Sequence, residues 1–359
     1  MAPTIIPFGP QHPVLPEPLH LKITTRDEIV TEVVPQLGFV HRGLEKLADL
    51  KDYNQLVQVV ERVCGICSCI HALTYAQAIE ALMQVEVPQR AHLLRVIWSE
   101  LHRIHSHLLW LGLLADAFGF ESLFMQCWRI REKIMDVLEA TAGNRVIISV
   151  NVVGGVRRDL TKEQCQWVLD VLKDVEKEFL ALEKVFINDY SVEKRTRGIG
   201  VLPKEKAYEL GACGPTLRGS GVAQDLRQTG YSGYGQLDFE PVVEQDGDSY
   251  ARCKVRFREV LQSIDLVRQA ISKLPEGGEV RVKVKGNPEG EIISRSEQPR
   301  GELLYYIKAS GTKKLDRLRI RTPTFANIPP LLTMLPGEDL ANVPVIVLSI
   351  DPCISCTER

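Results

Sequence analysis

The sequence predicts a mainly α-helical protein of the α+β class, in which a bundle of long helices forms the core beside small antiparallel sheets. Two observations predict this fold. Apolar residues recur at helical spacing over residues 88–118, 161–187 and 249–274. Near the N-terminus and around residues 278–321, apolar residues instead alternate between clusters of turn-forming residues. Long amphipathic helices of this kind bury their apolar faces against one another, so we expect a helix bundle as the core.

The N-terminal part of the chain is expected to be extended. Residues 1–20 carry six prolines, which exclude a regular helix because proline lacks a backbone donor. Residues 19–39 read as a hairpin with its turn at 25–28. Later in the chain, strands are expected at residues 280–284, 303–307 and 318–320.

Helices are expected through most of the remaining sequence. Thr161 and Gln164 have the spacing of a capping box, which marks the start of one of them. The glycine-rich stretch 211–235 lacks the ending of a phosphate-binding loop, so we expect it to pack closely against the bundle. The expected helices cover residues 44–50, 53–60, 68–83, 88–118, 125–144, 161–187 and 249–274.

The composition is that of an ordinary soluble protein and disfavours several functions. The chain has 359 residues, 45% of them hydrophobic, which is enough for one large core. A formal net charge of -2 provides no basic field, so nucleic-acid binding is not expected. No apolar run reaches the roughly 18 to 20 residues of a membrane span. There is no secretory signal pattern, so we expect the protein to stay in the cytoplasm.

We expect one domain, because no repeat, low-complexity tract or flexible linker divides the chain. Its parts are an N-terminal arm and hairpin (1–40), a helical core (41–275), a small sheet (276–322) and a C-terminal segment (323–359).

Two cysteine pairs lie near opposite ends of the chain and indicate a metal site. Cys64 and Cys67 form one C-x-x-C pair, and Cys353 and Cys356 form the other. Thiolates select soft ions such as zinc, iron–sulfur clusters and other thiophilic metals. Structural zinc, disulfides and a single iron remain alternatives, but 285 residues separate Cys67 from Cys353, which is unusual for a structural zinc module. An odd total of nine cysteines also favours reduced thiols over a disulfide framework.

The sequence segments around these cysteines resemble those of the large, catalytic subunit of [NiFe]-hydrogenases. The stretches are RVCGICSCIH at 62–71 and DPCISC at 351–356. Three further stretches, HRGLEK at 41–46, GPTLRGSG at 214–221 and PRGE at 299–302, resemble the membrane-bound, energy-converting (Ech-type) branch. That branch is similar to the quinone-pocket subunit of respiratory complex I. Complex I subunits lack the cysteine pairs, so their presence favours hydrogen chemistry.

The resemblance implies a nickel–iron centre. Cys64 and Cys353 would be terminal ligands of nickel, while Cys67 and Cys356 would bridge nickel to an iron that carries carbon monoxide and cyanide. Soft thiolates and an open metal position suit the binding and splitting of hydrogen.

The resemblance also implies roles for residues around the metals. Glu61, three residues before the first cysteine, would pass protons onward. Arg300 matches an arginine above the open metal position, and Asp351 matches the carboxylate that orients it. His71 would donate a hydrogen bond to a bridging sulfur.

A separate magnesium or iron ion is a further implication. Glu45 matches a family glutamate that binds such an ion near the C-terminal segment. Many relatives supply a histidine as a second ligand at the position where this chain has Arg359.

The sequence therefore predicts the catalytic subunit of a membrane-associated, energy-converting [NiFe]-hydrogenase that interconverts H2 and protons. Four cysteines cannot also hold an electron-transfer chain, so a small iron–sulfur (4Fe-4S) subunit, ferredoxin and integral membrane, ion-translocating subunits are the expected partners. They would hold the chain on the cytoplasmic face of the membrane. The alternatives are a complex I-like quinone-pocket subunit with retained cysteines and a non-enzymatic scaffold stapled by zinc.

Overall fold

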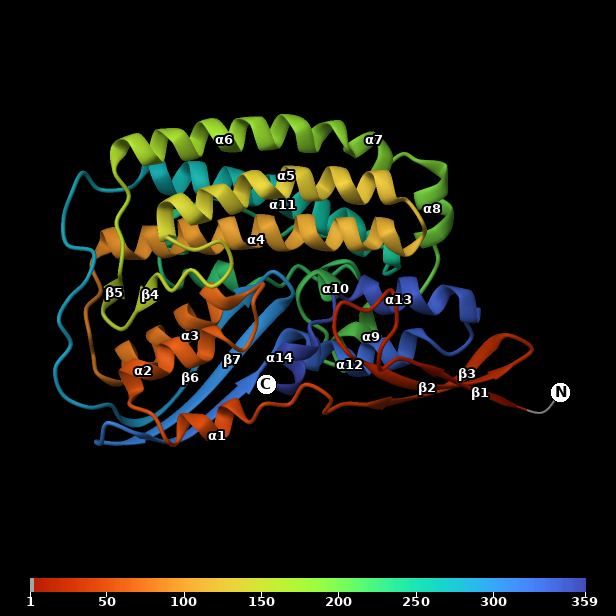
Figure 1. The fold of residues 1–359 in the computed structure, drawn as a ribbon, viewed down its shortest axis with the longest axis horizontal. Coiled ribbons are helices and arrows are strands. Elements are labelled where there is room, and N and C mark those ends of the chain that lie inside the picture. The colour runs from red at the N-terminus through yellow and green to blue at the C-terminus, as the bar shows by residue number, and fades with distance from the viewer. Residues whose placement is uncertain (1–2) are drawn as a thin grey trace.

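The computed structural model describes residues 3–359 and consists of a layer of long helices above a mixed layer of short helices and sheets (Figure 1). The mainly helical α+β class is confirmed. No helix in the described part of the chain is long and apolar enough to cross a membrane.

Four long helices form the upper layer, and α4 packs against both α5 and α11. Their apolar faces meet in one large core cluster. The capping box is confirmed, since Thr161 and Gln164 each bond the other's backbone at the start of α6. The four helices are α4 (Gln89–Ala117), α5 (Glu121–Ala142), α6 (Lys162–Ala181) and α11 (Ser249–Ser272).

Two of the predicted helices differ from the structure by more than two residues at one end. The helix expected from residue 125 begins four residues earlier, at Glu121, because the chain turns at Gly119 and Phe120 and can start a helix at once. The helix expected over 161–187 is interrupted at Leu182, after which α7 (Glu183–Phe186) follows as a separate short turn.

The C-terminal sheet is antiparallel with the order β6-β7-β8. It consists of β6 (Glu289–Gln298), β7 (Gly301–Ser310) and β8 (Leu315–Arg321). The strand predicted at 280–284 is wrong: this segment is extended but makes only an isolated bridge from Arg281 to Gly155. The apolar alternation there arises because the segment packs beside Gly154 and Gly155, whose missing side chains leave room for its backbone.

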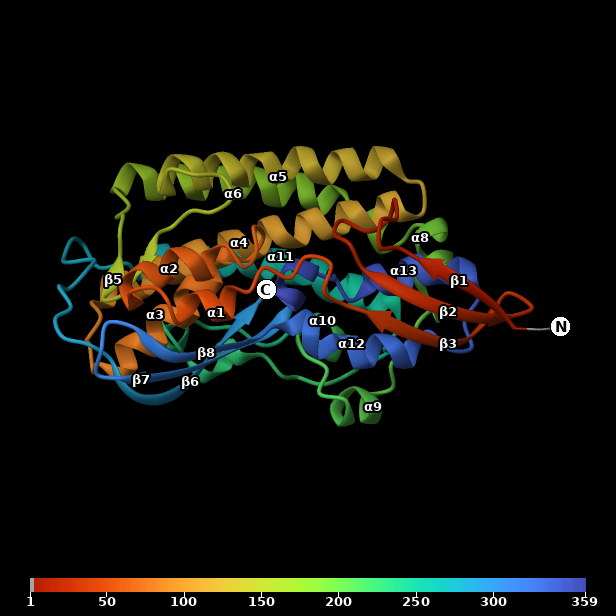
Figure 2. The same ribbon diagram turned by 60° about the horizontal axis from the view of Figure 1, so that its bottom comes forward.

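A second antiparallel sheet protrudes at the N-terminal end (Figure 2). The predicted hairpin is confirmed as β2 (His20–Arg26) and β3 (Ile29–Gln36). The proline-rich arm contributes a strand that sequence reasoning did not place, β1 (Thr4–Phe8), which pairs with β2. Its proline, Pro7, sits in an edge strand, where a missing N–H is tolerated.

Shorter elements fill the space between the layers and carry most of the residues described below. Helices α2, α3 and α14 approach the C-terminal sheet, so residues 53–82 and the C-terminal helix meet there (Figure 1). The short helices are α1 (Leu44–Ala48), α2 (Tyr53–Glu61), α3 (Ser68–Leu82), α8 (Tyr190–Thr196), α9 (Lys204–Glu209), α10 (Gly214–Arg218), α12 (Pro323–Met334), α13 (Val343–Ser349) and α14 (Ile354–Glu358). The 3-10 turns are η1 (Leu226–Thr229), η2 (Tyr234–Gln236) and η3 (Leu340–Asn342), and a two-stranded ribbon joins β4 (Asn151–Val152) to β5 (Gly155–Val156).

Candidate metal centre

The four cysteines of the two C-x-x-C pairs meet in one buried cluster. The Sγ atoms of Cys64 and Cys353 are 3.3 Å apart, and those of Cys67 and Cys356 are 3.5 Å apart. All four thiols are free and buried, with at most 3% of each residue exposed. The structure thus joins segments 289 residues apart in sequence, without disulfides.

The first pair is shaped at the start of α3. Cys67 directly precedes this helix, and the Ile66 N–H donates to the Cys64 sulfur over 3.2 Å. The rings of His102 and His105 on α4 both contact the Ile66 carbonyl, at 3.3 and 3.1 Å. Both histidines are fully buried, and their contacts with the Ile66 carbonyl help to hold the turn between the cysteines.

The second pair is held by the chain before and inside α14. Asp351 adopts a positive φ of 55°, a conformation that aspartate tolerates better than most residues. The Cys353 N–H donates to Thr324 Oγ1 over 3.1 Å. At the first turn of α14, the N–H groups of Ile354 and Ser355 donate to the carboxylate of Glu17. The proline-rich arm therefore helps to fix the cysteine turn.

Arg42 ties the two cysteine segments together. Its guanidinium donates to the carbonyls of Arg62 and Val63, each at 2.8 Å, and to that of Ser355 at 3.2 Å. The backbone before Cys64 and the backbone inside α14 therefore share one donor.

The electrostatics of the cluster call for a cation. Hydrogen bonds with the neighbouring thiols, from Cys353 first, hold the pKa of Cys64 well below its usual range. Burial raises the pKa of Cys67 and of Cys356 well above it. Several thiolates can coexist in such a buried space only when a metal ion compensates their charge.

The donor set fits a soft metal ion. The Sγ atoms of Cys64, Cys67 and Cys356 all lie within 4.8 Å of one another. Cys353 joins this group through its 3.3 Å contact with Cys64. Buried sulfurs this close together select a thiophilic metal such as zinc, nickel or iron over a hard ion.

Arg300 and Asp351 form a buried pair beside the cysteines. Arg300 Nη2 lies 2.8 Å from Asp351 Oδ1, and Arg300 Nε donates to the Asp351 carbonyl over 2.9 Å. Burial opposes the charge of Arg300, but Asp351 and the sulfurs of Cys353 and Cys64 raise its pKa well above the ordinary value. Arg300 Nη1 and Asp351 Oδ2 have no partner within the described chain, so the pair keeps a free donor and a free acceptor.

Glu61 ends α2 and is fully buried. Its Oε2 accepts a 2.6 Å hydrogen bond from Ser149 Oγ, while Oε1 has no partner within residues 3–359. Burial raises the pKa of Glu61 to about 7, although Ser149 and nearby arginines oppose the rise. The residue also lines a cavity of about 310 Å³ together with Arg62, Ser149 and Arg157. A carboxyl group that titrates near neutrality beside such a cavity can exchange protons.

His71 lies between Cys356 and Tyr305. Its Nε2 is 3.5 Å from the Cys356 sulfur, and its Nδ1 is 2.8 Å from the Tyr305 hydroxyl. Burial lowers the pKa of His71 to about 4, so the ring is neutral at pH 7. With the tyrosine donating to Nδ1, the remaining N–H points at the sulfur.

The residues around Glu45 do not fit a separate magnesium or iron ion. One carboxylate oxygen of Glu45 accepts from Arg359 Nε over 2.9 Å and from the Ile320 N–H over 2.9 Å, and the other lies 2.7 Å from Arg319 Nη1. Two guanidinium groups therefore occupy the place where a cation would bind. Arg359 also lies over the ring of Phe325, 5.4 Å from its centre.

Sequence reasoning placed no role on several residues that shape the cluster. Glu17 and Arg42 bond backbone groups, which no side-chain motif reveals. No sequence signal marks Ser149. Only the structure singles it out, as a non-glycine residue with a positive φ of 49°. Tyr305 alternates with other apolar residues along β7 and reads as core.

Comparison with known proteins gives two family matches. The family described as nickel-dependent hydrogenase matches residues 42–116. The family described as respiratory-chain NADH dehydrogenase, 49 Kd subunit, matches residues 117–287 and 280–359.

Individual relatives cover nearly the whole chain. The membrane-bound hydrogenase subunit alpha of Pyrococcus furiosus is 42% identical, over 99% of this chain and 87% of its own length. The carbon monoxide-induced hydrogenase of Rhodospirillum rubrum is 41% identical, over 99% of both chains. Among solved structures, a chain of the membrane-bound sulfane sulfur reductase, an archaeal respiratory complex, superposes with a TM-score of 0.95 and 30% identity, covering 99% of this chain and 98% of that one.

The fold and the four-thiol cluster define a metalloprotein in which two segments distant in sequence supply one soft metal centre. Together with the matches, they identify the family. The chain belongs to the large, catalytic subunits of [NiFe]-hydrogenases, in the membrane-bound, energy-converting branch that is related to the 49 kDa subunit of respiratory NADH dehydrogenase.

Proposed function

We propose that this chain activates hydrogen reversibly at a nickel–iron centre held by Cys64, Cys67, Cys353 and Cys356. When bound, the centre, with carbon monoxide and cyanide on its iron, supplies the open metal position at which H2 is split into protons and electrons. The observation that carries the proposal is the buried cluster of four free thiols, which suits a soft metal, in a chain of the [NiFe]-hydrogenase family. All four cysteines would hold the centre; the family resemblance implies that Cys64 and Cys353 would be terminal and Cys67 and Cys356 bridging ligands.

The surrounding side chains would then move protons and orient the substrate. Glu61 takes protons from the centre, which its raised pKa and its place beside a cavity support. The Arg300 fork, held by Asp351, keeps one free N–H donor for the reacting site. His71 directs its remaining N–H at the Cys356 sulfur and so stabilises the thiolate. This contact supports the proposal that His71 hydrogen-bonds a bridging cysteine.

Electrons must leave through a partner subunit, because the four cysteines that bind the nickel–iron centre cannot also hold an electron-transfer cluster. We propose a small 4Fe-4S subunit, ferredoxin as the electron carrier and integral membrane subunits that translocate ions, on the cytoplasmic face. The printed names of the relatives, a membrane-bound hydrogenase and an archaeal respiratory membrane complex, support the membrane partners.

A complex I-like quinone-pocket role is the alternative, since the family of the 49 kDa subunit matches most of the chain. A quinone-pocket subunit does not need the thiol cluster, so we favour hydrogen chemistry. The complex, isolated without oxygen, tests the choice. We expect nickel in an amount equal to this subunit, iron in excess because of the iron–sulfur subunit, infrared bands of carbon monoxide and cyanide, and hydrogen–deuterium exchange. Zinc in place of nickel, or no nickel, would refute the proposal.

A further inference from the structure

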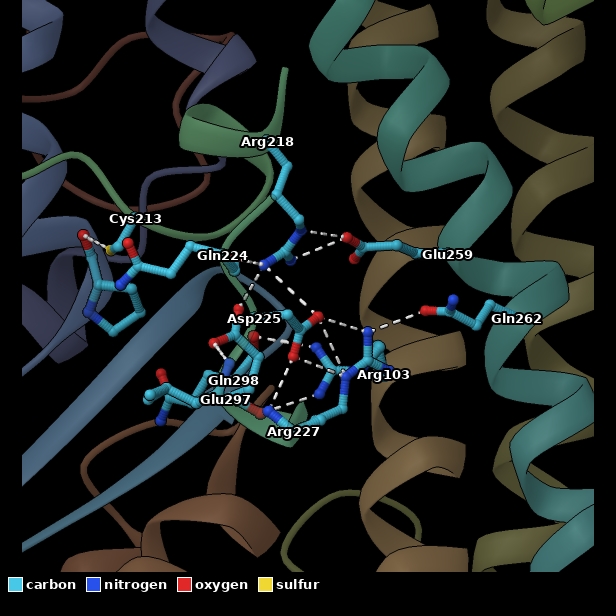
Figure 3. Close-up of polar contacts among 12 residues, drawn as sticks. Arg103, Cys213, Arg218, Gln224, Asp225, Arg227, Glu259, Gln262, Glu297 and Gln298 are labelled. Atoms are coloured by element: carbon cyan, nitrogen blue, oxygen red, sulfur yellow. Dashed lines mark hydrogen bonds and ion pairs between the residues drawn. The ribbon is translucent and has the colours of Figure 1, made fainter. Parts of the chain in front are cut away.

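A second group of charged side chains is buried away from the cysteines, between α4, α10, η1, α11 and the end of β6 (Figure 3). We call it the buried charge cluster. At most 3% of any member is exposed. It contains four carboxylates and three guanidinium groups, namely Glu100, Asp225, Glu259, Glu297, Arg103, Arg218 and Arg227.

The charges of this cluster do not balance when every carboxylate is ionised. Among the groups in ion-pair contact, four negative charges face three positive charges, while the guanidinium of Arg256, unpaired within residues 3–359, acts on Glu259 only from beyond ion-pair distance. His107 contacts Glu259 at 2.9 Å, but burial lowers the pKa of this histidine to about 4, so it adds no charge at pH 7. Among the described residues, no further lysine or arginine forms an ion pair with the four carboxylates. An unpaired buried charge is costly, and a carboxyl group removes it by binding a proton.

The contacts of three carboxylates favour ionisation. Asp225 faces Arg227 through contacts of 2.7 to 3.2 Å and accepts a backbone N–H as well. Glu259 accepts from Arg218 at 2.8 and 2.9 Å. Glu100 faces Arg103 and Arg227, both at 3.2 Å, and the Tyr234 hydroxyl.

Glu297 is the carboxylate with the least compensation. It has one guanidinium contact, to Arg218 Nη1 at 2.8 Å, which is shared with Glu259 and Asp225. Its other oxygen accepts the Leu226 N–H over 3.1 Å. The groups that face it are Arg218 from α10, Asp225 before η1 and Arg103 from α4. Burial first, and then the charge of Asp225, raise the pKa of Glu297 to about 7 against the opposing effect of these arginines.

The cluster is joined to the metal centre by direct backbone contact. Glu297 lies three residues before Arg300, in the turn from β6 to β7. Gly214, at the start of the helix that carries Arg218, packs so tightly on this turn that a Cβ atom would lie 2.2 Å from the Arg300 carbonyl. A shift of Arg218 or of the strand end therefore reaches Arg300.

A buried arginine adds an electrostatic connection. Arg256 lies 4.2 Å above the ring of Trp110, and its Nε and Nη2 have no partner in residues 3–359. Burial lowers the pKa of Arg256 to about 10, while the charges of Asp351 and Glu259 oppose this fall most strongly. One member of the metal pocket and one member of the cluster thus act on the same guanidinium.

We propose that the buried charge cluster holds one exchangeable proton on Glu297, and that this proton changes the field at Arg300 in the metal pocket. Glu297 is then a positioning residue and a proton reservoir, separate from the proton exit at Glu61. The first half of the proposal stands on the cluster alone, whereas the second half rests on the proposed nickel–iron centre.

The test uses the full complex carrying Glu61→Gln, because Glu61 also titrates near pH 7. Infrared difference spectra recorded during a pH titration should show one protonated carboxyl band that disappears with a midpoint near pH 7. Adding Glu297→Gln should remove this band. The matched control Glu302→Gln, on β7 and ion-paired to Arg321 at 3.2 Å, should keep it.

The second readout concerns the metal pocket. The carbon monoxide and cyanide bands of the Glu61→Gln complex should shift with the same midpoint, and this shift should vanish when Glu297→Gln is added. No titrating carboxyl band in the Glu61→Gln complex would overturn the proposal even if the double variant fails to fold. A band that survives Glu297→Gln would overturn it too. Diatomic bands that do not move would overturn the coupling to Arg300. Absence of diatomic bands would instead refute the nickel–iron centre while leaving the carboxyl titration readable.

Discussion

Glu61 and Glu297 are two buried glutamates whose pKa values are both raised to about 7, yet their surroundings differ completely. Glu61 has one hydroxyl partner, Ser149, and lines a cavity of about 310 Å³. Glu297 is enclosed by arginines and a second carboxylate and is 2% exposed. Burial is the largest cause of both shifts, so the pKa alone does not separate a proton exit from a proton store.

The partners of each carboxylate separate these roles. A proton on Glu61 can leave through the cavity, because one of its oxygens has no protein partner. A proton on Glu297 neutralises the excess negative charge among the ion-paired groups of the buried charge cluster. Its gain or loss changes the field at the other carboxylates that contact Arg218. The comparison suggests that proton conduction requires a free oxygen and open space, whereas charge storage requires fixed neighbours.

The largest expected effect comes from removing the metal pocket on which the comparison depends. Cys67→Ser replaces a soft thiolate by a hard hydroxyl, so we expect nickel to fall to background in metal analysis of the purified complex and the infrared bands of carbon monoxide and cyanide to disappear, while the iron of the 4Fe-4S subunit stays. Cys69→Ser is the matched control: Cys69 is buried two residues further along, and its sulfur accepts from Asn151 rather than joining the cluster. Full metal content in the Cys67 variant would exclude this residue as a ligand.

Glu61→Gln should block proton release through Glu61 while leaving the exchangeable proton on Glu297 in place. The amide oxygen can still accept from Ser149, so the fold and the metals should persist, while hydrogen–deuterium exchange falls by about 10² to 10⁴-fold. Glu61→Asp keeps a carboxyl group and should restore part of the exchange. Unchanged exchange in the glutamine variant would show that protons leave by another route.

The same variant changes how stability depends on pH. The folded protein binds the Glu61 proton more tightly than the unfolded chain, so wild type loses stability as pH rises from about 4.5 to about 7. The full loss corresponds to about 3 kcal/mol. Glu61→Gln lacks this loss, so its free energy of unfolding relative to wild type should rise over that range in chemical denaturation. A constant difference at every pH would contradict the raised pKa.

The helical part of the fold could be predicted because its signals are local. The apolar period of α4, α6 and α11 spans many turns, and a capping box marks Thr161. The sheets were less predictable because pairing is not local. The strand pattern at 280–284 reflects packing on Gly154 and Gly155, while the polar-rich β6 pairs along its whole length with β7.

The candidate site divides along a similar line. The four cysteines are recognised from the spacing of their pairs, whereas the roles of Glu61, Arg300 and Asp351 come from the resemblance to the hydrogenase family. Arg42 and Glu17 act on backbone groups of distant segments, which spacing cannot reveal. The buried charge cluster was missed because its members come from five elements, and each looks like a surface charge in sequence.

A smaller effect is expected when a neighbour of Glu61 is changed and the carboxyl group of Glu61 is kept. Ser149→Ala deletes the hydroxyl that donates to the ionised form of Glu61. The pKa of Glu61 should then rise by about one unit, because a hydrogen bond to a charged group is worth about 1.5 kcal/mol. The pH profile of hydrogen–deuterium exchange should move upward by the same amount. Ser149→Gly, which suits the positive φ at this position, should give the same shift, and the carboxyl titration of Glu297 should not move.

The smallest expected effect concerns a third glutamate, which tests whether neighbours can outweigh burial. Burial alone would raise the pKa of Glu45, but the Ile320 amide and the guanidiniums of Arg319 and Arg359 lower it below the ordinary value near 4.5. Glu45 is therefore ionised at pH 7, and its stabilising contribution is present above about pH 4.5 and lost below it.

Glu45→Gln should lower the free energy of unfolding by at most about 1 kcal/mol at pH 7, because part of the ion-pair network is open to solvent. The difference from wild type should disappear below the pKa of the folded protein. Chelation of magnesium or iron before the measurement should change neither result, since Arg359 takes the position of a cation. A loss of stability that appears only after chelation would show that a metal ion, rather than the two arginines, neutralises this glutamate.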